Sequence, residues 1–187
     1  MKRIFTSVKI VPDANFSSIY NQLKVALRHD RINWVPLHNM HLTLKFFGEV
    51  HDEQVEAIDE VLQQVADRHK PFEMELFSTG IFGSSYDPRV VWFGIRHSEH
   101  ISALATDVLD AVVPLDFLRD RQNFRPHLTI GRVKNITDKN IFQQAIRKHS
   151  DSLIQEVKVD SFELIESKLR PQGSIYTVLA SYRLEGK

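Results

Sequence analysis

The chain has 187 residues, of which 42% are hydrophobic and 26% are charged, and its 24 basic side chains balance its 24 acidic ones. This composition is typical of a folded globular protein and excludes a disordered chain. Zero net charge argues against a broad cationic surface for duplex nucleic acid but leaves a local basic cleft possible.

The length favours one domain over residues 1–187, built from two lobes around a sizeable core. Because the chain has no cysteine, disulfides and thiolate metal sites are excluded. No run approaches the ~20 apolar residues of a membrane span, and the first residues carry no apolar stretch typical of a signal peptide. We therefore expect a cytoplasmic protein with no membrane partner.

Strand-like and helix-like segments alternate along the chain, which is typical of an α+β protein. Asp52, Ser98 and Thr137 lie where three of the helices are expected to begin. In chain order, we expect a strand at 3–10, a helix at 16–27, a strand at 41–47 that stops at Gly48, a helix at 52–65, strands at 72–79 and 90–95 around a turn-rich loop at 80–89, a helix at 98–112, a strand after Pro126, a helix at 137–146, and strands at 157–165 and 175–184.

Two of the expected strands begin with nearly identical runs, His41–Leu44 (HLTL) and His127–Ile130 (HLTI). Because residues i and i+2 of a strand point to the same side, each run places a His and a Thr on one face and two aliphatic side chains on the other. The two runs lie about half the chain apart, and an amphipathic helix follows each. The sequence therefore predicts two similar lobes, related by an approximate two-fold axis, that bring both motifs to a central cleft.

Two imidazoles and two hydroxyls around one point form a set of groups suited to phosphate-ester chemistry. One His can accept a proton from water, and the other can donate one to a leaving oxygen, because the ordinary His pKa of about 6.5 suits both roles. Thr43 and Thr129 can hold the non-bridging phosphate oxygens. Sequence symmetry leaves open which of His41 and His127 is the acid. The alternative is that two amphipathic strands each carry an exposed His.

Cationic side chains beside the motifs are candidates for binding phosphate. Strict strand alternation adds Lys45 to the face of the first motif and Arg125 to the face of the second. Arg132 lies at the end of the second motif strand, where the register is open, and an arginine can bind phosphate in bidentate fashion. The alternative for all three is an ordinary solvated charge at a strand end.

Aromatic side chains near the motifs are candidates for stacking on a base, although core packing is the commoner role of such residues. The candidates by position are Trp34, Phe46, Phe47, Phe82 and Tyr176. A metal pair of His38 and His41 is disfavoured, because strand geometry separates their faces and no carboxylate lies close in sequence. We therefore predict no metal site and no cofactor.

Several further segments accompany the two motifs and give the chain a family resemblance. They are Arg3–Phe5, Trp34–Pro36 followed by His41–Val50, Arg89–Gly94, Phe124–Val133, and Leu164–Ser167 followed by Gly173 and Tyr176. With them, the chain resembles the 2H phosphoesterase superfamily and, within it, the bacterial and archaeal RNA 2′,3′-cyclic phosphodiesterases, also called 2′-5′ RNA ligases. Phe47 and Ile130 depart from the commonest pattern at positions that do not face the cleft.

The resemblance implies a bilobal α+β fold, with two antiparallel sheets related by a pseudo-two-fold axis, helices on the outer faces and a central cleft. It implies hydrolysis of RNA 2′,3′-cyclic phosphate ends to 2′-phosphates, with some relatives joining RNA ends through a 2′-5′ bond. It makes His41 the proton donor and His127 the base. The implied partners are RNA ends, such as those of tRNA halves, bound by a monomer.

Two other functions stay open. The substrate could be a small cyclic nucleotide or an ADP-ribose cyclic phosphate rather than RNA. The protein could instead hold RNA ends without catalysis, although binding alone would not need two proton-transfer groups.

Overall fold

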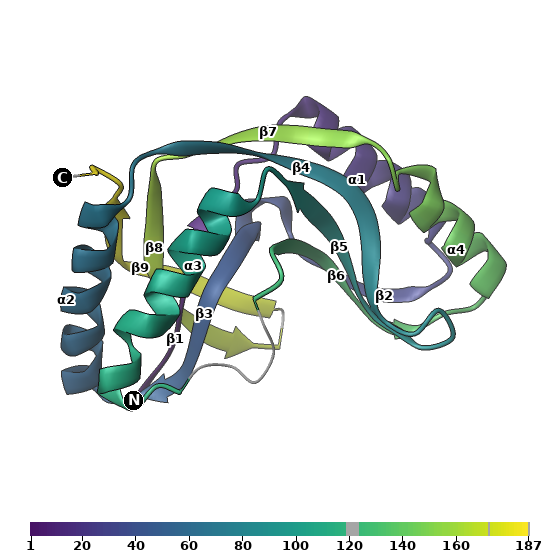
Figure 1. Ribbon diagram of the computed structural model, residues 1–187. Coiled ribbons are helices and arrows are strands. Elements are labelled where there is room, and N and C mark those ends of the chain that lie inside the picture. Colours follow the sequence, from purple (N-terminus) through teal and green to yellow (C-terminus); the bar gives the residue numbers. More distant parts are fainter. Residues whose placement is uncertain (119–123, 172, 187) are drawn as a thin grey trace.

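The computed structural model describes residues 1–118, 124–171 and 173–186. Two antiparallel sheets, each covered on its outer side by a pair of helices, form two lobes side by side (Figure 1). The strands are β1 (Lys2–Lys9), β2 (Arg31–Trp34), β3 (His41–Val50), β4 (Phe72–Gly83), β5 (Pro88–Arg96), β6 (His127–Asn135), β7 (Leu153–Val159), β8 (Ser161–Arg170) and β9 (Gly173–Arg183). The helices are α1 (Ala14–Ala26), α2 (Asp52–Arg68), α3 (Glu99–Ala111) and α4 (Lys139–Lys148), with short 3-10 turns at Leu37–Asn39 and Val113–Leu115.

The chain crosses between the two sheets several times. One sheet has the strand order β3-β1-β8-β9, and the other has the order β2-β6-β5-β4-β7. Helices α2 and α3 pack on the first sheet, whereas α1 and α4 pack on the second (Figure 1). The order of motif strand and helix is therefore repeated, as β3 followed by α2 and as β6 followed by α4. This confirms the predicted bilobal α+β fold.

Local sequence signals fix where most helices begin. The Asp13 carboxylate accepts a hydrogen bond from the Phe16 N–H at 2.7 Å and caps α1. Helix α2 starts with Asp52 and Glu53 in its first turn, where acidic side chains suit the helix dipole. Ser98 precedes α3 as predicted, but its side chain makes no capping hydrogen bond.

The predicted cap of the fourth helix is wrong by one residue. Asp138, not Thr137, accepts the N–H groups of Asn140 and Ile141 at the start of α4. The Thr137 hydroxyl instead donates to the carbonyl of His29 at 2.7 Å. The carboxylate of Asp138 is the better capping acceptor. The hydrogen bond of Thr137 instead connects the loop before α4 to the turn that follows α1.

Three predicted strand boundaries are also wrong. The first motif strand does not stop at Gly48 but continues to Val50, since Gly48 adopts a positive φ of 82° inside a β-bulge. The loop predicted at 80–89 is shorter, because β4 runs to Gly83 and β5 begins at Pro88. The predicted strand at 157–165 spans the end of β7 and the start of β8, which are separated at Asp160.

Strand β2 was not predicted at all. It is four residues long and forms the edge of the second sheet, where its partner among the described strands is β6. Its alternation is too short to stand out in the sequence.

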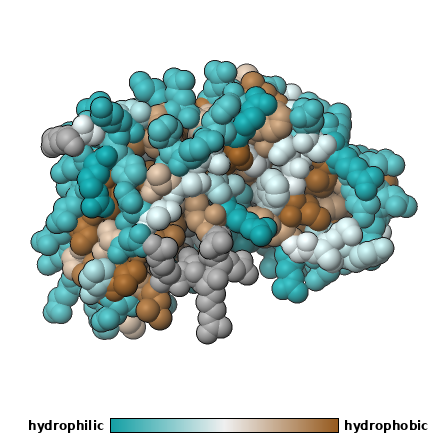
Figure 2. All heavy atoms as spheres, in the orientation of Figure 1, coloured by the Kyte–Doolittle hydropathy of each residue, from teal (hydrophilic) through white to brown (hydrophobic). Residues whose placement is uncertain are grey.

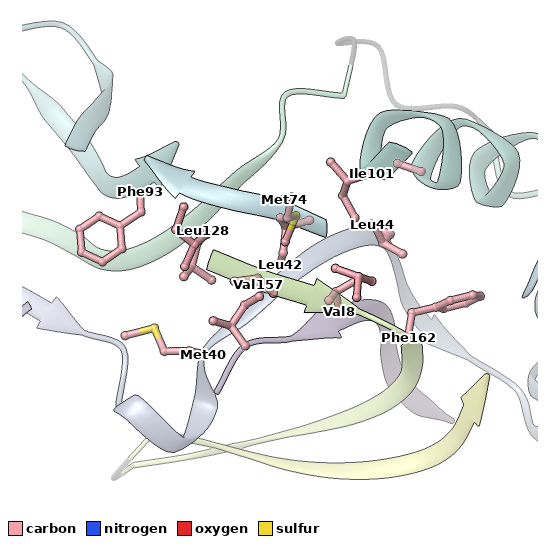
Figure 3. Close-up of a cluster of buried hydrophobic side chains, with 14 of the residues drawn as sticks. Val8, Met40, Leu42, Leu44, Met74, Phe93, Ile101, Leu128, Val157 and Phe162 are labelled. Atoms are coloured by element: carbon pink, nitrogen blue, oxygen red, sulfur yellow. The ribbon is translucent and has the colours of Figure 1, made fainter. Parts of the chain in front are cut away.

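One buried cluster of apolar side chains continues through both lobes. It contains Leu42 from β3 and Leu128 from β6, both fully buried, together with residues of β4, β5, β7 and α3 (Figure 3). Figure 2 shows that hydrophilic side chains cover most of one outer face, with apolar side chains in separate patches. Among the described residues, no helix is both long and apolar enough to cross a membrane.

Candidate active site

The two motifs meet where the two sheets adjoin. Strands β3 and β6 belong to different sheets and lie next to each other. Leu42 and Leu128, the second residues of the motifs, both point into the shared core (Figure 3). Since side chains alternate along a strand, the His and Thr of each motif lie on the opposite side, which we call the motif face.

Both motif histidines are held in the same way. The Nδ1 atom of His41 lies 2.6 Å from the carbonyl oxygen of Asn39, and the Nδ1 atom of His127 lies 2.7 Å from that of Arg125. A carbonyl oxygen can only accept a hydrogen bond, so Nδ1 carries the proton in each ring. In the neutral imidazole, Nε2 is then the atom with a free lone pair. The two histidines thus have the same tautomer, with Nε2 unprotonated in each neutral ring.

Aromatic rings from other strands of the same sheet contact both imidazoles. The His41 ring centroid lies 4.9 Å from that of Phe5 and 5.2 Å from that of Tyr176. The His127 ring meets Phe82 edge to face at 4.6 Å. Tyr176 and Phe82 thus lie beside the motif histidines, together with Phe5, which the sequence did not indicate.

The same cation, Arg132, acts on both imidazoles. Burial is the main cause that lowers the pKa of His41 and of His127, and the positive charge of Arg132 lowers both further. The hydrogen bond from each Nδ1 to its backbone carbonyl partly opposes these effects. Because one guanidinium influences both rings, the two motifs share one electrostatic environment.

A β-bulge follows the threonine in each motif and decides which later residue reaches the motif face. In β3, Thr43 pairs with Ser7 but Lys45 pairs with Thr6, which leaves Leu44 as an extra residue. In β6, Thr129 pairs with Trp92 but Gly131 pairs with Val91, which leaves Ile130 as the extra residue. The alternation of side chains is therefore shifted by one beyond each motif.

The bulges place two of the predicted site residues on the motif face. Arg132 pairs with Val90, on the side of Trp92 and Thr129. Phe46 pairs with Phe5, which contacts His41, and Phe46 remains 45% exposed. The guanidinium of Arg3 lies 4.8 Å from the centre of the Phe46 ring.

Lys45 does not share the face of the first motif, which corrects the prediction from strict alternation. Its pairing with Thr6 turns it toward the helix-covered side of the sheet. Its side chain is 5% exposed, and its ammonium group donates to the carbonyl oxygen of Leu118 at 3.0 Å. The bulge at Leu44 is the physical reason, since it adds one residue between Thr43 and Lys45.

Arg125 precedes β6 and is exposed, and its backbone carbonyl rather than its guanidinium is what contacts His127. Trp34 packs edge to face against Tyr20, and Phe47 packs edge to face against Phe117.

Two buried polar atoms beside the motif threonines were missed from sequence. Ser7 Oγ and Trp92 Nε1 have no hydrogen-bond partner among the described residues. Ser7 is the strand partner of Thr43, and Trp92 is the strand partner of Thr129. Their positions depend on which strands pair, β1 with β3 and β5 with β6, and local periodicity carries no information on pairing.

The described residues contain no group of three or more His, Asp or Glu side chains placed to hold a metal ion. What they bring together is two imidazoles with free Nε2 atoms, two hydroxyls and one guanidinium. This set can supply a base, an acid and positive charge to a phosphate ester.

Comparisons with known proteins show the family of this chain. The sequence model of the 2′-5′ RNA ligase superfamily matches residues 12–170. The RNA 2′,3′-cyclic phosphodiesterase of Archaeoglobus fulgidus is 34% identical over 174 residues, which cover 93% of this chain and 96% of that protein. The protein of the same name from Methanothermobacter thermautotrophicus is 32% identical over 168 residues, covering 90% of each chain.

Solved structures share the fold. The crystal structure of TT0787 from Thermus thermophilus superposes with a TM-score of 0.81 at 27% identity and covers 99% of both chains. The structure of E. coli LigT complexed with 3′-AMP gives a TM-score of 0.72 at 21% identity, over 98% of this chain and 97% of that one.

Proposed function

Because this chain belongs to the 2′-5′ RNA ligase superfamily, we propose that it is an RNA 2′,3′-cyclic phosphodiesterase that opens cyclic phosphate ends to 2′-phosphates. The observation that carries the proposal is that β3 and β6 lie side by side, that each motif imidazole is held through Nδ1 by a backbone carbonyl, and that Arg132 lies on the face of Thr129. Paired proton-transfer groups beside one cation suit in-line displacement at a phosphodiester.

A side chain of the site is available for each proton transfer in the reaction and for the charge on phosphate. His127 Nε2 accepts a proton from water, and the water oxygen attacks phosphorus. The bond from phosphorus to O3′ breaks, and protonated His41 delivers a proton from Nε2 to that oxygen. This assignment of acid and base follows the family resemblance. Thr43, Thr129 and Arg132 stabilise the negative charge on the non-bridging oxygens.

The same site can join RNA ends when a nucleoside 5′-hydroxyl takes the place of water. The products are then a 2′-5′ phosphodiester and a free 3′-hydroxyl, with the same two proton transfers. We expect RNA ends such as those of tRNA halves as substrates. We also expect a monomer to act alone, because one chain supplies both motifs.

The test compares single-turnover opening of a short RNA with a 2′,3′-cyclic end by the wild type and two variants. His41→Asn and His127→Asn keep an N–H able to bond to the carbonyl of Asn39 or Arg125 but cannot transfer a proton. Each is expected to lower the rate by about 10²–10⁴-fold while thermal unfolding stays two-state. A protein that binds the RNA but never opens the ring would be an end-binding protein, and the proposal would be wrong.

A sulfur-substituted substrate separates the two roles. When the leaving oxygen O3′ is replaced by sulfur, the departing thiolate needs no proton. The His41→Asn variant should then recover most of its rate, whereas His127→Asn should not. Recovery in His127→Asn instead would reverse the assignment of acid and base.

A further inference from the structure

A basic cavity adjoins the motif face at the end of β6. It has a volume of about 660 Å³ and lies between the turn that joins β4 to β5, the last residues of β6 and the first residue of α4. Four cationic side chains of the described residues line it, namely Arg89, Arg132, Lys134 and Lys139.

The net positive charge of the residues that line the cavity favours the binding of an anion. Asp87 is the only acidic residue that the described part of the chain adds to this lining, and its carboxylate lies 3.4 Å from the guanidinium of Arg89. The chain as a whole has a net charge of zero, so this excess of positive charge is local. A solvated cavity of this kind concentrates phosphates rather than neutral or cationic ligands.

Arg132 links the cavity to the candidate active site. Its charge lowers the pKa of both motif histidines, and the same residue lines the cavity. Lys134 lies two residues further along β6, on the same side of the strand and about 6.6 Å away along its axis. Arg132 and Lys134 therefore place cationic side chains in a row that runs from the motif face into the cavity.

The cavity also offers an aromatic surface. Tyr86 is 77% exposed, and the ammonium group of Lys139 lies 5.3 Å from the centre of its ring. An exposed aromatic ring flanked by cations is the usual arrangement for single-stranded nucleic acid, since the ring stacks on a base and the cations neutralise the backbone.

We propose that this cavity binds the nucleotide on the 5′ side of the cyclic terminus, with its phosphodiester against Lys134 and Lys139 and its base against Tyr86. The proposal rests on the cyclic phosphodiesterase function above and deepens it. It makes RNA strands of two or more nucleotides the preferred substrates over cyclic mononucleotides.

The experiment measures kcat/KM for two substrates with the same terminal nucleotide, 2′,3′-cyclic AMP and a tetranucleotide that ends in it. The double variant Lys134→Gln/Lys139→Gln removes two cationic side chains and leaves Arg132 in place. We expect kcat/KM to fall about tenfold for the tetranucleotide and to stay within twofold for the mononucleotide. The salt dependence should also weaken, by about 0.7 in the slope of log(kcat/KM) against log[salt] for each phosphate that the variant no longer neutralises.

A matched control removes the same charge elsewhere. Lys70 and Lys158 are exposed and lie outside this cavity, so Lys70→Gln/Lys158→Gln should change neither substrate by more than twofold. A second variant, Tyr86→Ser, should lower kcat/KM for the tetranucleotide only. Equal losses on both substrates, or no loss on the tetranucleotide, would overturn the proposal.

A direct binding measurement keeps this inference separate from the proposed function. Fluorescence anisotropy with the tetranucleotide ending in a 2′-phosphate needs no turnover. If the protein opened neither cyclic substrate, the function would be wrong. A Kd that is weakened in Lys134→Gln/Lys139→Gln would still support the cavity as an RNA subsite, and an unchanged Kd would reject it.

Discussion

Leu44 and Ile130 occupy equivalent places in the two lobes, since each is the extra residue of a β-bulge directly after the motif threonine. In consequence, the fifth residue after each histidine lies on the motif face. That residue is Phe46 in one lobe and Arg132 in the other. The two halves of the site are thus alike in their histidines and threonines but different at this position, which is aromatic in β3 and cationic in β6.

This difference predicts unequal roles for two basic residues that the sequence treats alike. Arg132→Gln should lower kcat/KM on a cyclic-ended RNA by about 10²–10³-fold, as expected for one preorganised group that stabilises transition-state charge. Lys45→Met should change kcat/KM by less than about threefold per folded molecule, because the ammonium group of Lys45 is bonded to the Leu118 carbonyl. Circular dichroism gives the folded fraction of both variants. A larger loss in Lys45→Met than in Arg132→Gln would contradict the assignment of faces.

The lowered pKa values of His41 and His127 set the pH dependence. Burial and Arg132 both disfavour the charged imidazole, so each free-enzyme pKa lies below the ordinary 6.5. The base is lost as pH falls through its pKa, and the acid is lost as pH rises through its own. The profile of kcat/KM against pH should therefore be bell-shaped, with its maximum on the acid side of 6.5.

The contribution of Arg132 to this shift can be measured without activity. In Arg132→Gln, NMR titration of the two imidazole Cε1 protons should show both pKa values rising, because a positive charge near each ring is removed. Arg89→Gln serves as the control, since Arg89 lines the neighbouring cavity but is not among the charges that act on either ring. Unchanged values in Arg132→Gln would place its guanidinium away from the histidines.

Removal of divalent metal ions is expected to leave the rate unchanged. In the proposed mechanism, the base and the acid are imidazoles and the charge on phosphate is met by Arg132 and the two threonines. Turnover of the cyclic-ended RNA should therefore be the same after dialysis against excess EDTA as in added Mg²⁺. A loss on chelation that is restored by Mg²⁺ would show that a metal ion takes one of these roles.

The sequence was sufficient to predict those parts of the site that follow from the alternation of side chains along a strand. The repeat of His-x-Thr, and the aliphatic residue between His and Thr that packs into the core, place the His and Thr of each motif on one face of their own strand without any knowledge of pairing. What lies beyond the motifs depends on the bulges, which local alternation does not show. Lys45 was therefore placed on the wrong face and the register of Arg132 was left open.

Contacts between strands that are distant in sequence could not be predicted from the sequence either. Phe5 and Tyr176 flank His41 because β1 pairs with both β3 and β8, and β8 pairs with β9. Tyr176 is a candidate by its position in the sequence, whereas nothing in the sequence favours Phe5. The choice of pairing partners is a property of the whole fold, since it depends on how both sheets close over the shared core.

A partly buried hydrogen bond far from the motifs provides a test of the fold alone. Tyr182 is 1% exposed, and its hydroxyl donates to Asp59 Oδ1 at 2.6 Å, which joins β9 to α2. Tyr182→Phe should lower the free energy of unfolding in urea by about 1 kcal/mol and leave kcat/KM unchanged. Tyr86→Phe, at an exposed tyrosine, should not alter the free energy of unfolding. A change of catalytic rate in Tyr182→Phe would mean that this contact reaches the site.

A chain of contacts links Gly80 to His127. The indole of Trp92 lies directly over Gly80, so that a Cβ there would overlap its six-membered ring. Trp92 packs against Phe82 at 5.5 Å between ring centroids, and Phe82 packs against His127.

In Gly80→Ala, we expect overpacking to cost about 1–3 kcal/mol of stability and to move the imidazole, so that kcat/KM falls. Trp92 fluorescence, measured with Trp34→Phe to remove the other indole, should change as well. Because a smaller ring relieves the overlap, adding Trp92→Phe to Gly80→Ala should restore most of the lost stability. If Gly80→Ala is destabilising but Trp92→Phe gives no recovery, the indole is not what the glycine accommodates.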